Sequence, residues 1–218
     1  MRASQEGERP GPGEELNVGP PSRPRQAATV ILLRGGSEAL EVLLVKRTPE
    51  ARFMGGVWVF PGGAVDADEG DGDGAHRLAA IRELREEAAI GLDDPDALVK
   101  FSRWITPAAV KIRFDTHFFL ATLPDQQEPA VDGQEVVDLG WFSPQDALDA
   151  HAREEILLVF PTIKHLEQLD AFDSVSALLD YARGRVVEPV QPRLVIPGEG
   201  SPAGEVARIV LPGEPGYD

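Results

Sequence analysis

Residues 60–91 read FPGGAVDADEGDGDGAHRLAAIRELREEAAIG, a glycine turn followed by a segment rich in acids. The turn, Pro-Gly-Gly at 61–63, ends a short β-rich run at 57–60. Glycines allow a sharp turn there and let backbone groups approach a metal ion or a phosphate. Residues 75–89 have helical periodicity. We therefore predict a strand, a tight turn and a helix in that order.

Three carboxylates of the predicted helix are three and four residues apart, at Glu83, Glu86 and Glu87. That spacing puts them on one face, where they repel one another unless a cation neutralises them. Hard divalent ions such as Mg²⁺ bind oxygen ligands of this kind. The alternative is a solvated charged face on which Arg82 pairs with Glu86. The apolar residues expected to pack on the opposite face are Leu78, Ile81, Leu84 and Ala88.

The stretch resembles the Nudix box of diphosphate hydrolases, Gly-x5-Glu-x7-Arg-Glu-U-x-Glu-Glu-x-Gly-U, where U is a bulky aliphatic residue. It departs from the box in two places. Twelve residues instead of seven separate Glu69 from Arg82, so Asp71 and Asp73 compete with Glu69 for its role, and residues 70–74 have the composition of a flexible loop. Ala89 replaces the last glycine, and Gly91 offers a left-handed end to the helix. The matching residues are Gly63, Glu69, Arg82, Glu83, Leu84, Glu86, Glu87 and Ile90.

Patterning alone leaves an α+β or an α/β sandwich open. The resemblance implies the Nudix fold, an α+β protein (α/β/α sandwich) with a mixed sheet, and an enzyme that hydrolyses acid anhydrides with Mg²⁺ or Mn²⁺. In it Glu83 is also a candidate base for water, Arg82 orients a glutamate, and Glu135 is a weaker, loop-borne candidate base. The implied metal ligands are Glu83, Glu86, Glu87 and the Gly63 carbonyl.

A second resemblance concerns the substrate. Residues 43–66 are similar to the coenzyme A diphosphatase signature and depart from it at Val45 and Thr48. The residue types that carry this similarity are Leu43, Leu44, Arg47, Arg52, Gly56, Phe60, Pro61, Gly62, Gly63 and Asp66. The box insertion and Phe-Pro-Thr at 160–162 also resemble the peroxisomal type of this group.

The signature implies hydrolysis of coenzyme A or acyl-coenzyme A to adenosine 3′,5′-bisphosphate and 4′-phosphopantetheine. Arg47, Arg52 and Gly62 would bind the substrate, because arginine suits bidentate phosphate contacts. The alternatives are a Nudix hydrolase of ADP-ribose, NADH or a nucleoside triphosphate, and a nucleotide-binding Nudix sensor without activity. An isopentenyl diphosphate isomerase is excluded because it needs a cysteine and the chain has none.

Outside the box, a hairpin is expected from β-rich runs at 27–33 and 41–46 around Gly35-Gly36-Ser37. We expect one domain over 26–218, with a core at about 26–150 and a helical, Pro/Gly-rich extension at 151–218, behind a disordered leader at 1–25. Trp58, Trp104 and Trp141 are expected to fill the core. Further strands are expected at 101–105, 116–123 and 136–141, and helices after Ser143-Pro144 and at 154–169 and 174–183.

The net charge is −16, from 21 basic and 37 acidic residues. This acidity argues against binding to nucleic acid or to anionic membranes, and no apolar run approaches the ~18 residues of a membrane span. We therefore expect a cytoplasmic protein with a small-molecule nucleotide substrate. A homodimer is left open.

Overall fold

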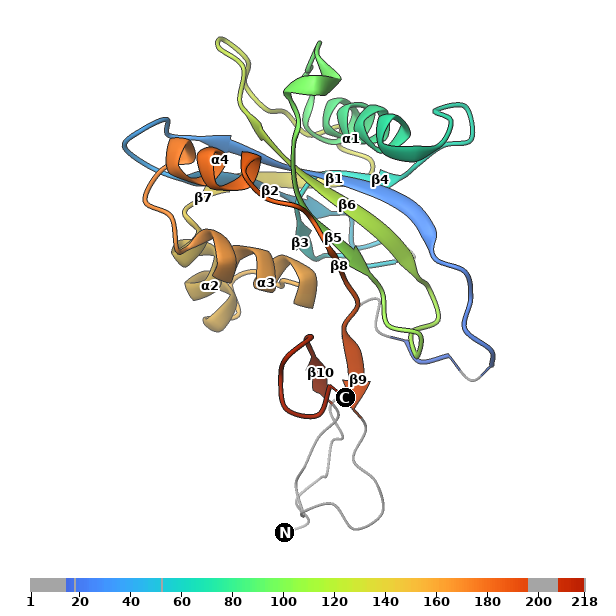
Figure 1. Cartoon of the computed structure of the whole chain (residues 1–218). Helices are drawn as coiled ribbons and strands as arrows, with labels where there is room; N and C mark the ends of the chain where they lie inside the picture. The colour runs from blue at the N-terminus through green and yellow to red at the C-terminus, as the bar shows by residue number, and fades with distance from the viewer. Residues whose placement is uncertain (1–14, 18, 52, 196–207, 218) are drawn as a thin grey trace.

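The computed structural model describes residues 15–17, 19–51, 53–195 and 208–217. A mixed sheet lies between α1 on one face and α2, α3 and α4 on the other (Figure 1). The helices are α1 (Gly72–Ala88), α2 (Pro144–Ala152), α3 (Phe160–Leu169) and α4 (Val175–Arg183), with a 3₁₀ turn at Pro95–Ala97. The strands are β1 (Arg25–Arg34), β2 (Glu41–Arg47), β3 (Trp58–Val59), β4 (Gly62–Ala64), β5 (Val99–Ile105), β6 (Phe114–Thr122), β7 (Val136–Phe142), β8 (Pro189–Val190), β9 (Arg193–Val195) and β10 (Arg208–Val210).

The main sheet has the strand order β3-β2-β1-β6-β5-β8, with β4 on β1 and β7 on β2. Strand β1 runs parallel to β6 and antiparallel to β2 and β4. The predicted hairpin is confirmed, with positive φ at Gly35 and Gly36, but β1 and β2 share only the pairs Leu33–Val42 and Arg34–Glu41. This mixed, sandwiched sheet confirms the α+β class.

Alternate residues of β1 enter two separate hydrophobic cores. Val30 and Leu32 pack with Leu84 beneath α1. Ile31 and Leu33 face the other way and pack with residues of α2, α3 and α4. A strand buried on both faces explains why residues 30–33 are continuously apolar rather than alternating.

Helix α1 begins at Gly72 rather than at residue 75, so much of the expected loop at 70–74 is helical. Asp71 is the extended N-cap residue, and Asp73 in the first turn pairs with Arg77 at 2.8 Å and with Lys100 at 2.9 Å. Three glycines lower the helix propensity of this turn, so propensity does not predict it. The pair of Asp73 with Arg77 is local, at i and i+4, whereas its pair with Lys100 is a tertiary contact.

Two further expectations about α1 are wrong. Ala89 itself adopts the left-handed conformation, with φ 56°, and its N–H donates to the Arg85 carbonyl, so Gly91 is not the cap. Leu78 is 47% exposed, and the small residues Ala79 and Ala80 are buried in its place. The helix lies close enough to the sheet for alanines to fill the interface.

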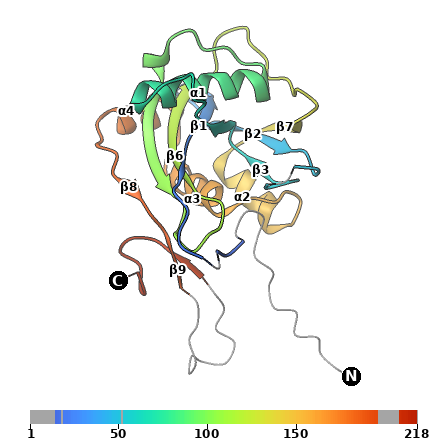
Figure 2. The same cartoon turned by 90° about the vertical axis from the view of Figure 1, so that its right-hand side faces the viewer.

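Downstream, Ser143 caps α2 as expected by accepting from the Asp146 N–H. Helix α3 starts at Phe160 rather than at 154, because Glu154 has a positive φ and Pro161 favours a helix start. In Figures 1 and 2, β9 lies beyond the end of the sheet, and β10, labelled in Figure 1, pairs with it.

The leader expected at 1–25 is described only at 15–17 and 19–25, and the rest of it lies outside the described residues. In the described part, the Asn17 N–H donates to the Ala109 carbonyl, the Lys111 N–H donates to Glu15, and β1 begins at Arg25. In the described part of the chain, no helix combines the length and apolarity that a membrane crossing needs.

Candidate active site

One pocket, with a volume of about 430 Å³, brings the glycine turn and the acidic helix together. It lies against β1 and β6 and is bounded by the turn, by one side of α1 and by the start of α3. Glu83 and Glu87 of α1 line it together with Glu135, which precedes β7. Gly62, Gly63 and Arg47 also line it, so this pocket unites six residues of the predicted site.

Glu87 is the most buried carboxylate of the site, with 3% of its surface exposed. It accepts a hydrogen bond of 2.9 Å from the Gly62 N–H and pairs with the Arg47 guanidinium at 3.4 Å. Burial raises the pKa of Glu87 to about 7, against these two contacts, and the charges of Glu83 and Glu135 add to the rise. Near neutral pH this carboxyl can therefore hold or release a proton.

Arg82 organises the carboxylates beside the pocket. Its guanidinium donates to Glu83 at 2.8 Å, to Glu69 at 2.9 Å and to the Ala64 carbonyl at 2.9 Å. The carboxylate acceptors raise the pKa of Arg82, and Glu69 has the largest effect. Burial raises the pKa of Glu83, although the contact with Arg82 acts in the opposite direction. Glu69 thus reaches the arginine of the box across the longer spacing, whereas Asp71 occupies the N-cap position of α1.

Glu86 is placed differently from the other two predicted ligands. Its side chain is 59% exposed, accepts a hydrogen bond of 3.1 Å from Arg82, and is not part of the pocket wall. The carboxylates therefore do not all point outward together, because Glu87 lies beside the buried Leu84 and turns towards the sheet.

The two glycines of the turn are needed for close packing. A Cβ atom at Gly62 would lie 2.5 Å from the Ala28 carbonyl oxygen, and one at Gly63 would overlap the carboxylate of Glu83. Any larger residue would push the turn away from α1 or displace Glu83. This geometry gives a physical reason for the Gly-Gly pair.

Arginines supply the positive charge of the pocket. Arg47 lines it, and its Nε atom is buried without a hydrogen-bond partner among the described residues. Arg25, the first residue of β1, also lines the pocket. From the sequence it is expected in the leader, because it follows a Pro/Gly-rich stretch. Arg52, the other predicted arginine, lies outside the described residues.

The donors present suit a hard divalent cation. Glu83 and Glu87 offer carboxylate oxygens to one pocket. Burial raises the pKa of both, and the charges of neighbouring carboxylates add to the rise, a condition that a cation relieves. As arranged, the described residues contain no group of three histidine, aspartate or glutamate side chains that could hold a metal ion. A third side-chain ligand therefore requires a movement. Either Glu86 gives up its contact with Arg82 and turns towards the pocket, or Glu135 moves closer to Glu83 and Glu87.

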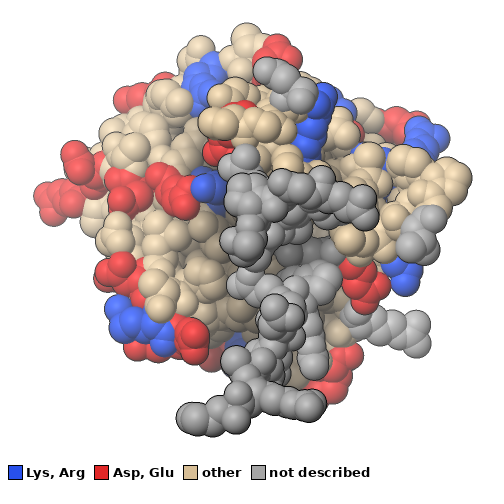
Figure 3. All heavy atoms as spheres, turned by 90° about the horizontal axis from the view of Figure 1, so that it is seen from below, with Lys and Arg blue, Asp and Glu red and all other residues tan. Residues whose placement is uncertain are grey.

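Charge on the outer surface forms no single patch in the view from below. Acidic and basic groups lie at separate places around the rim of that face, with uncharged surface between them (Figure 3). The view therefore gives no indication of a basic surface that would bind a polyanion, in keeping with the excess of acids.

Comparisons with known proteins agree with this geometry. A family model described as the NUDIX domain matches residues 23–160. Nudix hydrolase 7 of Caenorhabditis elegans is 28% identical, with 78% of this chain and 68% of that protein aligned. The human acyl-coenzyme A diphosphatase NUDT19 is 25% identical, with 78% and 75% aligned. The crystal structure of a NUDIX hydrolase from Alicyclobacillus acidocaldarius is 27% identical with a TM-score of 0.65, covering 73% of this chain and 96% of that one.

Proposed function

From the premise that this chain belongs to the Nudix hydrolase family, which acts on acid anhydrides, we propose that it hydrolyses the diphosphate of coenzyme A or acyl-coenzyme A. The observation that carries the proposal is the juxtaposition of Arg47, whose buried Nε has no partner among the described residues, and the carboxylates of Glu83 and Glu87 in one pocket. A cation donor and metal-ligating oxygens side by side suit a diphosphate.

The reaction is displacement at phosphorus by water. The water oxygen forms a bond to phosphorus, the bridging P–O bond of the anhydride breaks, and the bridging oxygen leaves with one phosphoryl group. Glu83 or Glu135 accepts the proton of the water. Family members generally use divalent metal ions; here we propose Mg²⁺ or Mn²⁺, which when bound neutralises phosphate charge and lowers the pKa of water. Glu83, Glu86, Glu87 and the Gly63 carbonyl are its proposed ligands.

The protein residues contribute position and charge. Arg82 holds Glu83 in place through its hydrogen bond of 2.8 Å, so Arg82 acts as a positioning residue. Arg47 binds a phosphate oxygen, and Arg25 offers a second charge in the same pocket. The substrate choice is supported by the coenzyme A-like signature at 43–66 and by the similarity to the human acyl-coenzyme A diphosphatase.

A substrate panel tests the proposal. Coenzyme A, dephospho-coenzyme A, ADP-ribose, NADH and a nucleoside triphosphate are each incubated with Mg²⁺ or Mn²⁺, and products are identified by mass spectrometry. Coenzyme A should yield adenosine 3′,5′-bisphosphate and 4′-phosphopantetheine. Dephospho-coenzyme A should be about tenfold poorer in kcat/KM, because it lacks one charge-assisted phosphate contact.

The matched variants are Arg47→Ala and Arg25→Ala. A variant that removes the 3′-phosphate contact shrinks the difference between coenzyme A and dephospho-coenzyme A, whereas one that removes a diphosphate contact slows both substrates. Much faster cleavage of ADP-ribose or NADH than of coenzyme A with either metal would overturn the substrate assignment.

A further inference from the structure

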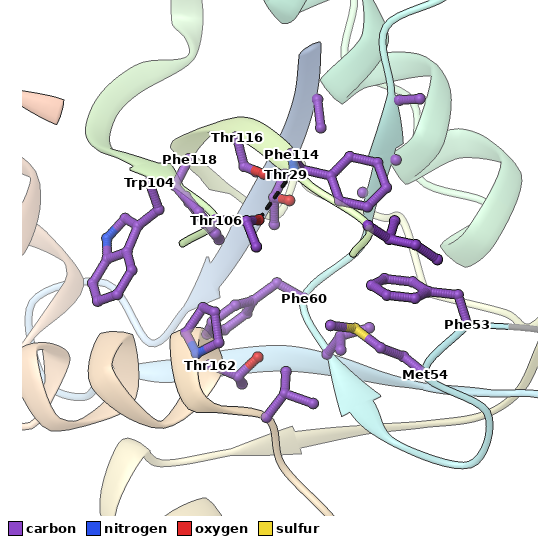
Figure 4. A pocket seen from close by; sticks show the side chains of 18 of the residues that line it. Thr29, Phe53, Met54, Phe60, Trp104, Thr106, Phe114, Thr116, Phe118 and Thr162 are labelled. Carbon is purple, nitrogen blue, oxygen red and sulfur yellow. Dashed lines mark hydrogen bonds between the residues drawn. The ribbon is translucent and has the colours of Figure 1, made fainter. Parts of the chain in front are cut away.

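Most of the pocket wall beyond the carboxylates is apolar. A group of apolar side chains that line this pocket, here termed the apolar compartment, consists of Trp104, Phe114, Phe118, Phe160 and Ile209. Figure 4 shows Trp104, from β5, at one side of the pocket and Phe114, from β6, at the other, with Phe60 between them in this view. The Phe114 ring packs against Phe53, with ring centres 5.7 Å apart. A diphosphate or a ribose is too polar to gain from contact with such a surface. The apolar surface therefore suits a different part of a ligand.

The walls of the compartment are held in place by packing and hydrogen bonds. Trp104 meets Phe160 nearly edge-on, with ring centres 6.2 Å apart. The Phe114 N–H donates to the Thr106 hydroxyl at 3.0 Å, which holds the strand beside that ring. His165 is buried behind the wall and links the start of α3 to β5: its Nδ1 donates to the Pro161 carbonyl and its Nε2 accepts from the Ser102 hydroxyl, both at 2.6 Å.

The remaining wall comes from the C-terminal part of the chain. Pro192 and Ile209 line the same pocket, one preceding β9 and the other inside β10. The two strands pair antiparallel, with Ile209 opposite Leu194. The box lies more than a hundred residues earlier in the sequence, yet the β9–β10 pair borders the pocket that contains its glutamates.

We propose that the apolar compartment binds an apolar chain carried by the substrate, and that Ile209 sets how long a chain it accepts. The inference rests on the proposed function in one respect, namely that the acidic end of the pocket holds the diphosphate. The compartment is continuous with that end, so one molecule can occupy both. In acyl-coenzyme A the group concerned is the acyl chain of the thioester.

The kinetic test uses coenzyme A, hexanoyl-coenzyme A and dodecanoyl-coenzyme A. Each fully buried methylene raises affinity by up to about fourfold, so kcat/KM should rise by about tenfold or more from coenzyme A to the preferred acyl form. Ile209→Asp should lower the ratio of acyl to free coenzyme A towards one. Val186→Asp is the matched control: Val186 is 82% exposed in the same extension, and its replacement should leave the ratio unchanged.

A second variant covers the case in which Ile209→Asp does not fold, as checked by circular dichroism. Ile209→Trp keeps the wall apolar but fills space, so it should reduce kcat/KM for dodecanoyl-coenzyme A more than for hexanoyl-coenzyme A. An unchanged preference for chain length in a folded Ile209→Trp variant would overturn the role of Ile209.

Binding of alkyl phosphates separates this proposal from the proposed function. In calorimetry without a nucleotide, octyl phosphate should bind at least about tenfold more tightly than butyl phosphate, and Ile209→Asp or Ile209→Trp should reduce that difference. If neither coenzyme A nor its acyl forms are cleaved while this difference persists, the proposed function fails and the compartment stands. If coenzyme A is cleaved and chain length matters in neither assay, the compartment is refuted and the function stands.

Discussion

The position of Glu87 favours its proposed role as a metal ligand but lowers the stability of the fold. Its carboxyl is almost fully buried, and its pKa in the folded protein is about 7, whereas glutamate in an unfolded chain titrates near 4.5. Between these two values the folded state binds more protons than the unfolded state, so the free energy of unfolding falls as pH rises. At pH 8, without metal, the charged carboxylate therefore destabilises the fold.

The variant Glu87→Gln should separate the effect of Glu87 on stability from its effect on activity. Its amide oxygen can still accept from the Gly62 N–H, and its neutral side chain avoids the penalty. In urea unfolding at pH 8 without metal, we expect the variant to be about 2 kcal/mol more stable than the wild type, with the advantage lost at pH 4.5.

Turnover of Glu87→Gln should meanwhile fall on the order of 100-fold or more. An active variant would remove Glu87 from the metal site. A variant less stable than the wild type at pH 8 would show that the charge of Glu87 is compensated within the protein.

At the scale of the element, the N-terminal turn of α1 depends on Asp73. This residue pairs with Arg77 and Lys100, whereas the side chain of the neighbouring Asp71 makes no capping hydrogen bond. Asp73→Ala should lower the free energy of unfolding by about 1 kcal/mol, and Asp71→Ala by less than about 0.5 kcal/mol. Chemical denaturation at two salt concentrations checks this order, because salt should reduce only the first loss. Equal losses would contradict it.

Helix α3 is attached to the sheet through His165, whose pKa burial lowers to about 4. The unfolded chain, with a histidine pKa near 6.5, binds more protons between these values, so stability falls as pH falls from about 6.5 to 4. His165→Gln should lose about 2 kcal/mol less than the wild type between pH 7 and pH 5, as measured by unfolding at both values. Ser102→Ala keeps the imidazole and should retain the wild-type pH dependence. Equal pH dependence in all three proteins would refute this account.

The elements that could be predicted are those whose signals are local. Ser143 followed by Pro144 marks a helix start, and Gly35 with Gly36 marks a hairpin turn, because the responsible groups lie within a few residues. The left-handed Ala89 and the helical Gly72 could not be found in this way. There, tertiary contacts outweigh propensities that differ by only about 1 kcal/mol per residue.

For the molecule as a whole, a divalent ion should report on the integrity of the site. Saturating Mg²⁺ or Mn²⁺, at about 100 times its Kd, should raise Tm by roughly 5 °C or more, since a ligand of the folded state stabilises it by about 2.7 kcal/mol. Glu83→Gln and Glu87→Gln should each reduce that increment, as read by calorimetry against sodium chloride of equal ionic strength. An undiminished increment in both variants would place the ion elsewhere.

The predicted residues that line the pocket are those of the box and its turn together with Arg47 and Glu135. Spacing alone brings Glu83 and Glu87 to one helix side, but Arg25, Trp104 and Ile209 come from three distant segments. Their meeting depends on the pairing of β1 with β6 and on the path of the chain after α4, neither of which leaves a periodic signal in the sequence. Trp104, expected to fill the core, packs against it and also lines the pocket.

The parallel pairing of β1 with β6 also bears on how the protein forms during synthesis. Residues 25–33 pair with residues 114–122, so the first strand leaves the ribosome long before its neighbour exists. Until then, among the described strands, its backbone can pair only with β2, over two residue pairs, and with β4. Non-local pairings of this kind slow folding and prolong the exposure of apolar, aggregation-prone segments. The nascent chain is therefore most exposed to misassembly and to chaperone capture in the interval between translation of β2 and of β6.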